Sequence, residues 1–109
     1  MTNATDILPE ADVQPLIAPA RLTSTERLEF RRDVLELLEV AARQGETAVT
    51  VDLAQTVELD ASGLGVLVLL QKRARERGLR TRLLHPTRTV AEMLHLTRLD
   101  ALFEFVSVD

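Results

Sequence analysis

Apolar residues at helical spacing mark one long helix in the first half of the chain. They recur three and four positions apart and form a single apolar stripe, made of Phe30, Val34, Leu37, Leu38 and Ala41. Thr23 and Glu26 have the spacing of a capping box, which begins a helix. Gly45 is a typical residue just past a helix end. The pattern predicts a helix with Thr23 as its N-cap that runs to about Gln44.

Short runs of apolar and β-branched residues predict strands elsewhere. Ala48–Leu53 is the clearest of them and reads as a buried strand. Pro19 interrupts the first run, and proline is tolerated best on an edge strand, where its missing N–H costs no ladder bond. Residues 57–59 would extend the sheet only briefly. The predicted strands cover residues 16–22, 48–53, 57–59, 80–84 and 105–108.

The apolar run Leu64–Leu70 is ambiguous by itself, because a buried strand and a helix can share that composition. It continues into residues that are mostly helix formers, and this length favours a helix from about Gly63 to Arg77. Gly78 would end that helix.

A third and shorter helix is predicted after Pro86, capped by Thr87 or Thr89 and ending near His95. Beyond it, the expected core contacts are Leu99, Leu102 and Phe103.

Strands and helices thus alternate along the chain, which is typical of an α/β domain with a mostly parallel sheet and right-handed crossovers. A length of 109 residues suits a single domain. The polar segment 1–13 reads as a flexible lead-in, and residues 14–109 as the domain.

Composition narrows the setting. The chain has no cysteine, which rules out disulfides and thiolate metal sites and favours a reducing compartment. Its longest apolar stretch is far shorter than the roughly 20 residues that span a bilayer. We therefore expect a cytoplasmic protein that does not insert into membranes.

Charge is unevenly distributed along the chain. The net charge is −4, yet residues 61–109 carry eight basic and five acidic side chains. A basic segment over residues 72–88 could steer a partner, although cations also suit the end of a helix. Nucleic-acid binding fits poorly, because the chain is acidic overall and has three aromatic residues with which to stack on bases. The bases of this segment are Lys72, Arg73, Arg75, Arg77, Arg80, Arg82 and Arg88.

Familiar catalytic motifs are absent. Ser62 is preceded two residues earlier by Asp60, not by the glycine of a Gly-x-Ser-x-Gly nucleophile turn. His85 and His95 lack the spacing of a zinc-binding helix. Gly63-Leu64-Gly65 lacks the third glycine of a dinucleotide fingerprint. These absences favour a binding module that is not an enzyme and needs no cofactor or metal.

One turn of the chain has features that the fold alone does not require. In Asp60-Ala61-Ser62-Gly63, Ser62 is a natural N-cap for the following helix. Gly63 and Gly65 weaken a helix, but they let another backbone come close. The turn also follows a strand, at the end where α/β folds tend to bind ligands and partners. We therefore expect the working surface of the protein here.

These segments resemble the STAS domain family, as in bacterial anti-sigma-factor antagonists. The resemblance covers roughly residues 14–108 and implies a curved sheet with helices mainly on one side. It is carried by Val49–Leu53, by Leu59–Leu67 with its Asp-Ala-Ser-Gly-Leu-Gly stretch, and by Leu96–Phe103.

The resemblance also implies a signalling mechanism that regulates transcription by partner switching. In antagonists, the serine that matches Ser62 is phosphorylated by a kinase that doubles as the anti-sigma factor. The unphosphorylated form binds that kinase and frees the sigma factor, and a PP2C-type phosphatase resets the phosphoprotein. By this resemblance the partner-binding residues would be Asp60, Ala61, Ser62, Gly63, Leu64, Gly65 and Thr23.

One departure keeps other roles open. Thr23 stands where family members often have an acid near the phosphorylation site. An alternative STAS role is a regulatory subunit that docks on an ABC-transporter ATPase through the same turn. A scaffold of the stressosome type is a third interpretation.

Overall fold

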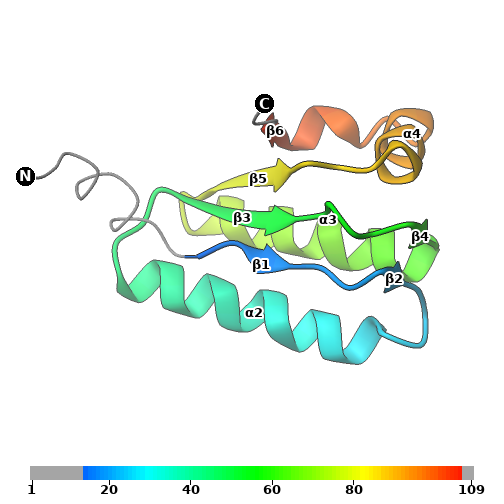
Figure 1. Ribbon diagram of the computed structural model, residues 1–109. Helices are drawn as coiled ribbons and strands as arrows, with labels where there is room; N and C mark the ends of the chain where they lie inside the picture. The colour runs from blue at the N-terminus through cyan, green and yellow to red at the C-terminus, as the bar shows by residue number, and fades with distance from the viewer. Residues whose placement is uncertain (1–13, 107–109) are drawn as a thin grey trace, which may run out of the picture.

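The main sheet has four strands, all of them parallel (Figure 1). The computed structural model describes residues 14–106, so the expected lead-in 1–13 lies outside the described residues. The α/β class and the parallel sheet are confirmed. The strand order across the sheet is β1 (Leu16–Ile17), β3 (Ala48–Asp52), β5 (Arg80–Leu84) and β6 (Glu104–Val106).

A second, two-stranded parallel sheet lies beyond the carboxyl end of β3, where β2 (Arg21–Leu22) pairs with β4 (Glu58–Leu59). The expectation that residues 57–59 extend the main sheet was therefore wrong. Their backbone N–H groups are already engaged, because those of Val57 and Glu58 both donate to the Ala20 carbonyl. The Thr56 hydroxyl also donates to the Pro19 carbonyl at 2.8 Å, which ties this turn to the segment between β1 and β2.

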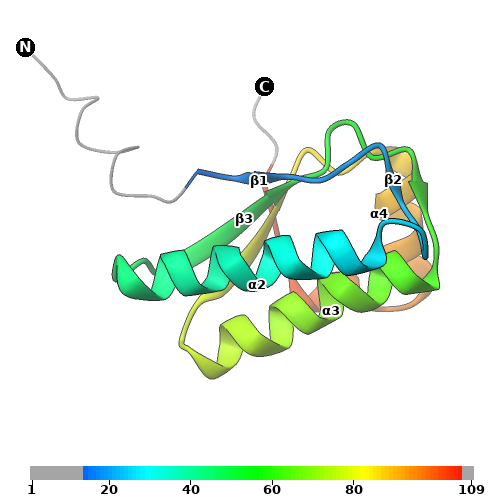
Figure 2. The ribbon, with the colours of Figure 1, turned by 90° about the horizontal axis from the view of Figure 1, so that it is seen from below.

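Helices α2 (Arg27–Arg43) and α3 (Ala61–Glu76) lie side by side on one face of the main sheet (Figure 2). The predicted apolar stripe of α2 is buried along its whole length. Gly45 and Gly78 adopt φ values of +69° and +72° just past the two helices, as their place in the sequence predicted.

The predicted N-cap of α2 was wrong. The helix begins at Arg27, and Thr23 instead opens a tight turn in which the Glu26 N–H donates to the Thr23 carbonyl at 3.0 Å. The Thr23 hydroxyl donates to the Glu26 carboxylate, so it is not an acceptor for a helix N–H. Half of the capping box survives, since Glu26 accepts from the Thr23 N–H at 2.9 Å.

The third helix, α4 (Arg88–Leu96), is capped by Thr87, whose hydroxyl accepts from the Val90 N–H. A short 3-10 helix, η2 (Asp100–Leu102), leads into β6. Phe103 is buried as expected, but Leu102 is 38% exposed, so the prediction that it closes the core was wrong. The last predicted strand extended to residue 108, and residues 107–109 lie outside the described part of the chain.

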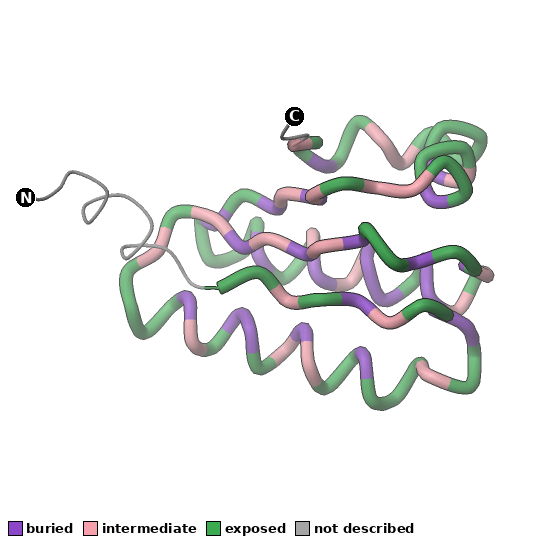
Figure 3. The backbone as a smooth tube through the Cα atoms, viewed as in Figure 1, coloured by how far each residue is buried: buried purple, intermediate pink, exposed green. Residues whose placement is uncertain are grey.

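The core lies between the main sheet and the pair α2 and α3, as the buried positions in Figure 3 show. Along β3, Val49 and Val51 are buried, while Ala48, Thr50 and Asp52 are half-buried on the opposite face. None of the helices in residues 14–106 is long and apolar enough to cross a membrane. This arrangement places the starts of α2 and α3 together at the carboxyl end of the strands (Figure 1).

Candidate functional site

Asp60 is the residue that builds the turn before α3. Its carboxylate accepts from the Gly63 N–H at 3.0 Å and thereby caps the helix. The second carboxylate oxygen accepts from the Ser24 N–H at 3.1 Å, so one side chain joins the start of α3 to the turn that precedes α2. The bond from the Gly63 N–H is the main reason that the pKa of Asp60 lies below its ordinary value, and the bond from Ser24 adds to it.

The sequence predicted Ser62 as the N-cap of α3, and this prediction was wrong, because Asp60 takes that place. Ser62 is the second residue of α3, because the helix begins at Ala61. An ionised carboxylate with two acceptor oxygens can serve two donors at once, which a hydroxyl at position 62 could not do here. The Ser62 side chain is half-buried, and its hydroxyl forms no hydrogen bond with any residue in 14–106.

Thr23 and Glu26 form the other half of this turn region. Thr23 is 7% exposed, and its hydroxyl donates to Glu26 Oε1 at 2.6 Å. That hydrogen bond, with the one from the Thr23 N–H, lowers the pKa of the Glu26 carboxyl. The carboxylate of this turn thus belongs to Glu26, and the Thr23 side chain is directed inward to hold it.

The two glycines of the turn have different surroundings. A Cβ on Gly63 would lie 2.1 Å from the Leu22 carbonyl oxygen, so the backbone that comes close here is β2 of the same chain. A Cβ on Gly65 would meet nothing within 4 Å, because this residue faces outward. Gly63 therefore serves the packing of α3 on β2, and Gly65 leaves the outer surface of α3 without a side chain.

The remaining predicted site residues are divided between surface and core. Ala61 is exposed, whereas Leu64 is 8% exposed and belongs to the hydrophobic core. The part of the predicted set that solvent reaches is therefore Asp60, Ala61, Ser62 and Gly65.

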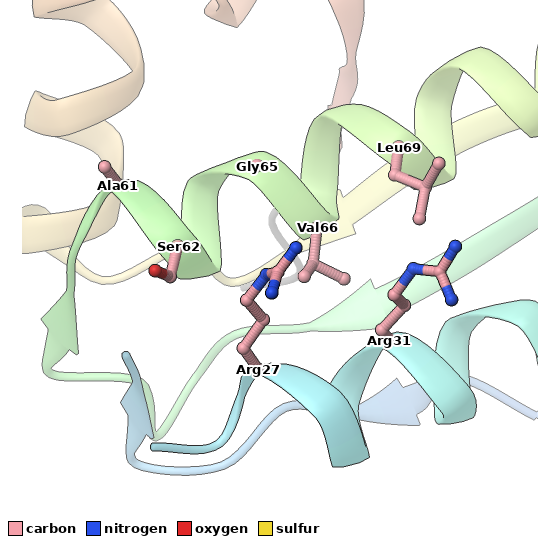
Figure 4. Close-up of a pocket in the computed structure, with 7 residues that line it drawn as sticks. All are labelled: Arg27, Arg31, Ala61, Ser62, Gly65, Val66 and Leu69. Carbon is pink, nitrogen blue, oxygen red and sulfur yellow. The ribbon is translucent and has the colours of Figure 1, made fainter. Parts of the chain in front are cut away.

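A cleft of about 380 Å³ lies between the N-terminal halves of α2 and α3. Figure 4 shows Arg27 extending from α2 toward α3 and ending next to Val66, with Ser62 one turn earlier on α3 and Arg31 one turn further along α2, facing Leu69. Seven residues line this cleft: Arg27, Arg31, Ala61, Ser62, Gly65, Val66 and Leu69.

Arg27 and Arg31 have no carboxylate within 4 Å among the residues that the structure describes. Six other arginines do form ion pairs, and their partners are acids on the same or a neighbouring element. Neither Arg27 nor Arg31 was among the site residues predicted from the sequence. Their spacing of four residues was the available signal, since it places both on one helix face.

The basic segment 72–88 is partly neutralised within the chain. Arg77 pairs with Glu39 at 2.6 Å, and Arg80 and Arg82 both approach Glu104. Four of its seven basic residues pair in this way when the pair between Arg88 and Glu92 is included. Surface pairs of this kind contribute little to stability, but they reduce the positive charge that the segment presents to a partner.

A family model described as "Mlab, STAS domain" matches residues 20–106, which is most of the chain. The chain belongs to the STAS domain family. No protein of curated function matches it significantly in sequence.

Solved structures share this STAS fold. The crystal structure of a candidate anti-sigma factor antagonist from Thermotoga maritima, TM1081, aligns with a TM-score of 0.70 at 23% sequence identity. The alignment covers 85% of this chain and 78% of that one. An NMR structure of TM1081 gives a TM-score of 0.68 at 22% identity, over 84% of this chain and 71% of the other. At this level of identity the likeness establishes the fold.

The described part of this STAS domain contains no group of three or more histidine, aspartate or glutamate side chains that could hold a metal ion. His95, near the end of α4, lies 3.3 Å from Asp100. The polar side chains among the residues that line the cleft are those of one serine and two arginines, which suit anion recognition.

Proposed function

We propose that this STAS domain is an anti-sigma-factor antagonist whose binding to an anti-sigma kinase is switched off by phosphorylation of Ser62. The observation that carries the proposal is that Asp60 caps α3, which leaves the Ser62 hydroxyl without a partner among residues 14–106 at the rim of an open cleft. A serine needed as the cap would have its oxygen occupied, and its modification would disturb the helix start. Here the fold does not depend on that hydroxyl.

The surroundings of Ser62 favour a protein partner. Ala61 and Gly65 are exposed beside it, and Gly65 leaves space in which a partner could approach the backbone of α3. Leu28, in the first turn of α2 next to Arg27, is 75% exposed. A small polar centre with apolar surface nearby is the kind of patch that protein interfaces use.

Phosphorylation would act on the interface while leaving the fold intact. The kinase transfers the γ-phosphoryl group of ATP to Ser62 Oγ, the hydroxyl proton is lost, and ADP leaves. The new group carries about −1.5 to −2 charges. The start of a helix tolerates negative charge, so folding should be little affected. The cost of desolvating the phosphate against the partner's surface, added to its bulk, can supply the roughly 2.7 kcal/mol that a hundredfold loss of affinity requires.

The proposed cycle needs two partners, both in the cytoplasm. The anti-sigma factor is also the serine kinase, and a PP2C-type phosphatase removes the phosphate by hydrolysis. In this account the domain itself catalyses nothing and contributes a surface with two states.

The test is incubation with ATP and each anti-sigma-type serine kinase encoded in the same genome, followed by intact-mass and peptide mass spectrometry. We expect one phosphate on wild type and on the Ser24→Ala control, and none on Ser62→Ala. Ser24 is a suitable control because it is an exposed serine in the adjacent turn. Phosphate at another residue, or no phosphate with any kinase, would contradict the proposal.

A pull-down from the source cells separates this function from the alternatives. Capture of the kinase by wild type and its loss with Ser62→Asp supports partner switching. Capture of an ABC-transporter ATPase or of a large STAS assembly, unchanged by Ser62→Asp, would instead assign a docking or scaffold role.

A further inference from the structure

The arginine pair, Arg27 and Arg31, is the feature of the cleft that the fold leaves unexplained. The two side chains lie four residues apart on α2, and both line the cleft that contains Ser62 (Figure 4). Neither has a carboxylate within 4 Å among residues 14–106. Like charges at this spacing destabilise a helix slightly, so the two arginines cost the fold a little stability when no anion lies between them.

Acids were available on the same helix but are engaged elsewhere. Glu29 and Asp33 both lie within 4 Å of Arg32, on another side of α2. The Glu26 carboxylate at the start of the helix accepts two hydrogen bonds from Thr23. The cleft therefore presents two guanidinium groups and, among the residues that line it, no carboxylate.

We propose, building on the proposed phosphorylation of Ser62, that the arginine pair is an intramolecular acceptor for the phosphate of phosphoserine 62. A guanidinium group forms paired, charge-assisted hydrogen bonds with phosphate oxygens, which an ammonium group cannot match in geometry. Ser62 has one side-chain torsion, so a change of rotamer is the movement available to turn its oxygen into the cleft. In Figure 4 the Ser62 oxygen points away from Arg27, whose guanidinium group lies next to Val66, one turn along α3, and Arg31 lies one turn beyond.

This acceptor gives the switch a defined second state. In the unphosphorylated protein the cleft between α2 and α3 is open. In the phosphorylated protein, the phosphate would fill its entrance and engage Arg27, with Arg31 contributing more weakly from further away. A partner would then meet a changed surface on both helices, and the phosphate would be held in one position.

The experiment uses the full chain with phosphoserine installed at position 62 by amber suppression, so that no kinase is needed. The phosphate is titrated by phosphorus NMR. A nearby guanidinium favours the dianion, so we expect an acid dissociation constant about tenfold or more above that of a free phosphoserine peptide, whose second pKa is about 6. Arg27→Gln should reverse most of this increase, and Arg31→Gln a smaller part. Arg27→Lys keeps the positive charge and should retain only part of the increase in the acid dissociation constant.

The matched control is Arg43→Gln, which removes an exposed arginine from the far end of the same helix, one with no ion-pair partner in the described part of the chain. Equal titration of the phosphate in the Arg27→Gln, Arg31→Gln double variant and in Arg43→Gln would overturn the acceptor. Because Arg27 and Arg31 are exposed, the variants should fold, and amide proton–nitrogen spectra verify it.

The two proposals can fail separately. If the kinase phosphorylates Ser62 but the arginine variants do not change the titration of the phosphate, the acceptor proposal is refuted and the proposed switch is not. An installed phosphate that the arginines hold, in a protein that no kinase modifies, supports the acceptor's chemistry and refutes the proposed switch.

Discussion

Replacing Gly63 with alanine tests the packing that positions the Ser62 turn. The added Cβ would lie 2.1 Å from the Leu22 carbonyl oxygen and 2.8 Å from the Leu22 carbonyl carbon. Real Cβ atoms do not approach other heavy atoms so closely, and the obstructing atoms belong to the backbone of β2. They cannot move aside as a flexible side chain would, so α3 or β2 must shift.

The magnitude follows from this clash. Overpacking a well-packed site costs typically about 1–3 kcal/mol. Alanine is also the better helix former by up to about 1 kcal/mol, which offsets part of the loss. We expect Gly63→Ala to lower the free energy of unfolding by roughly 1–2 kcal/mol on balance. A domain of this size then loses very roughly 4–12 °C in Tm.

Urea denaturation followed by circular dichroism provides the assay, with Gly65→Ala as the control. The control makes the same chemical change two residues further along α3, where a Cβ meets nothing within 4 Å, so it should raise stability by up to about 1 kcal/mol. The two alanines should therefore shift the urea midpoint in opposite directions. A Gly63→Ala variant as stable as wild type would refute the close packing of α3 on β2.

Two further changes test individual hydrogen-bonding groups by the same unfolding assay. Asp60→Asn should destabilise the protein at neutral pH. The amide has a single, uncharged oxygen, whereas the two carboxylate oxygens accept from the Gly63 and the Ser24 N–H groups. Since the folded-state pKa of Asp60 is lowered, its contribution is complete above its unfolded pKa of about 3.9 and is lost as the pH falls through the folded value. The variant should therefore lose stability less steeply than wild type below about pH 4, and parallel pH curves would contradict this reasoning. Thr81→Val should stabilise the protein by about 1 kcal/mol, because the buried Thr81 hydroxyl has no hydrogen-bond partner in the described structure. A loss of stability in Thr81→Val would mean that the hydroxyl is satisfied after all.

The elements that could be predicted from sequence are those with strong local signals. The apolar stripe of α2 has a clear helical period, and Gly45 and Gly78 mark helix ends through a backbone conformation that glycine adopts readily. The central strand β3 has a run of β-branched residues. Each of these signals lies within a few residues of the structure that it specifies.

The features that were missed depend on contacts between distant parts of the chain. Asp60 and Ser62 are both good capping residues, and the Ser24 N–H, 36 positions earlier, shows why the acid takes this place. The pairing of β4 with β2 has the same origin, since nothing within residues 57–59 says which strand they join. Leu102 is apolar, but η2 leaves it partly exposed.

The site itself was half predictable. The turn around Ser62 stands out in sequence because glycines are unusual near a helix start. The role of Gly63 was misjudged, since the close backbone belongs to β2. Arg27 reaches the cleft because α2 packs against α3. No local sequence pattern near Ser62 predicts that packing.

The most direct measurement is the affinity of a purified anti-sigma kinase of the source genome for two forms of this chain, one with serine and one with phosphoserine at position 62. Titration calorimetry without ATP keeps the two forms unchanged during the experiment. We expect the kinase to bind the serine form and to bind the phosphoserine form at least a hundredfold more weakly. Equal affinity of the kinase for both forms would contradict the central claim that Ser62 is the switch.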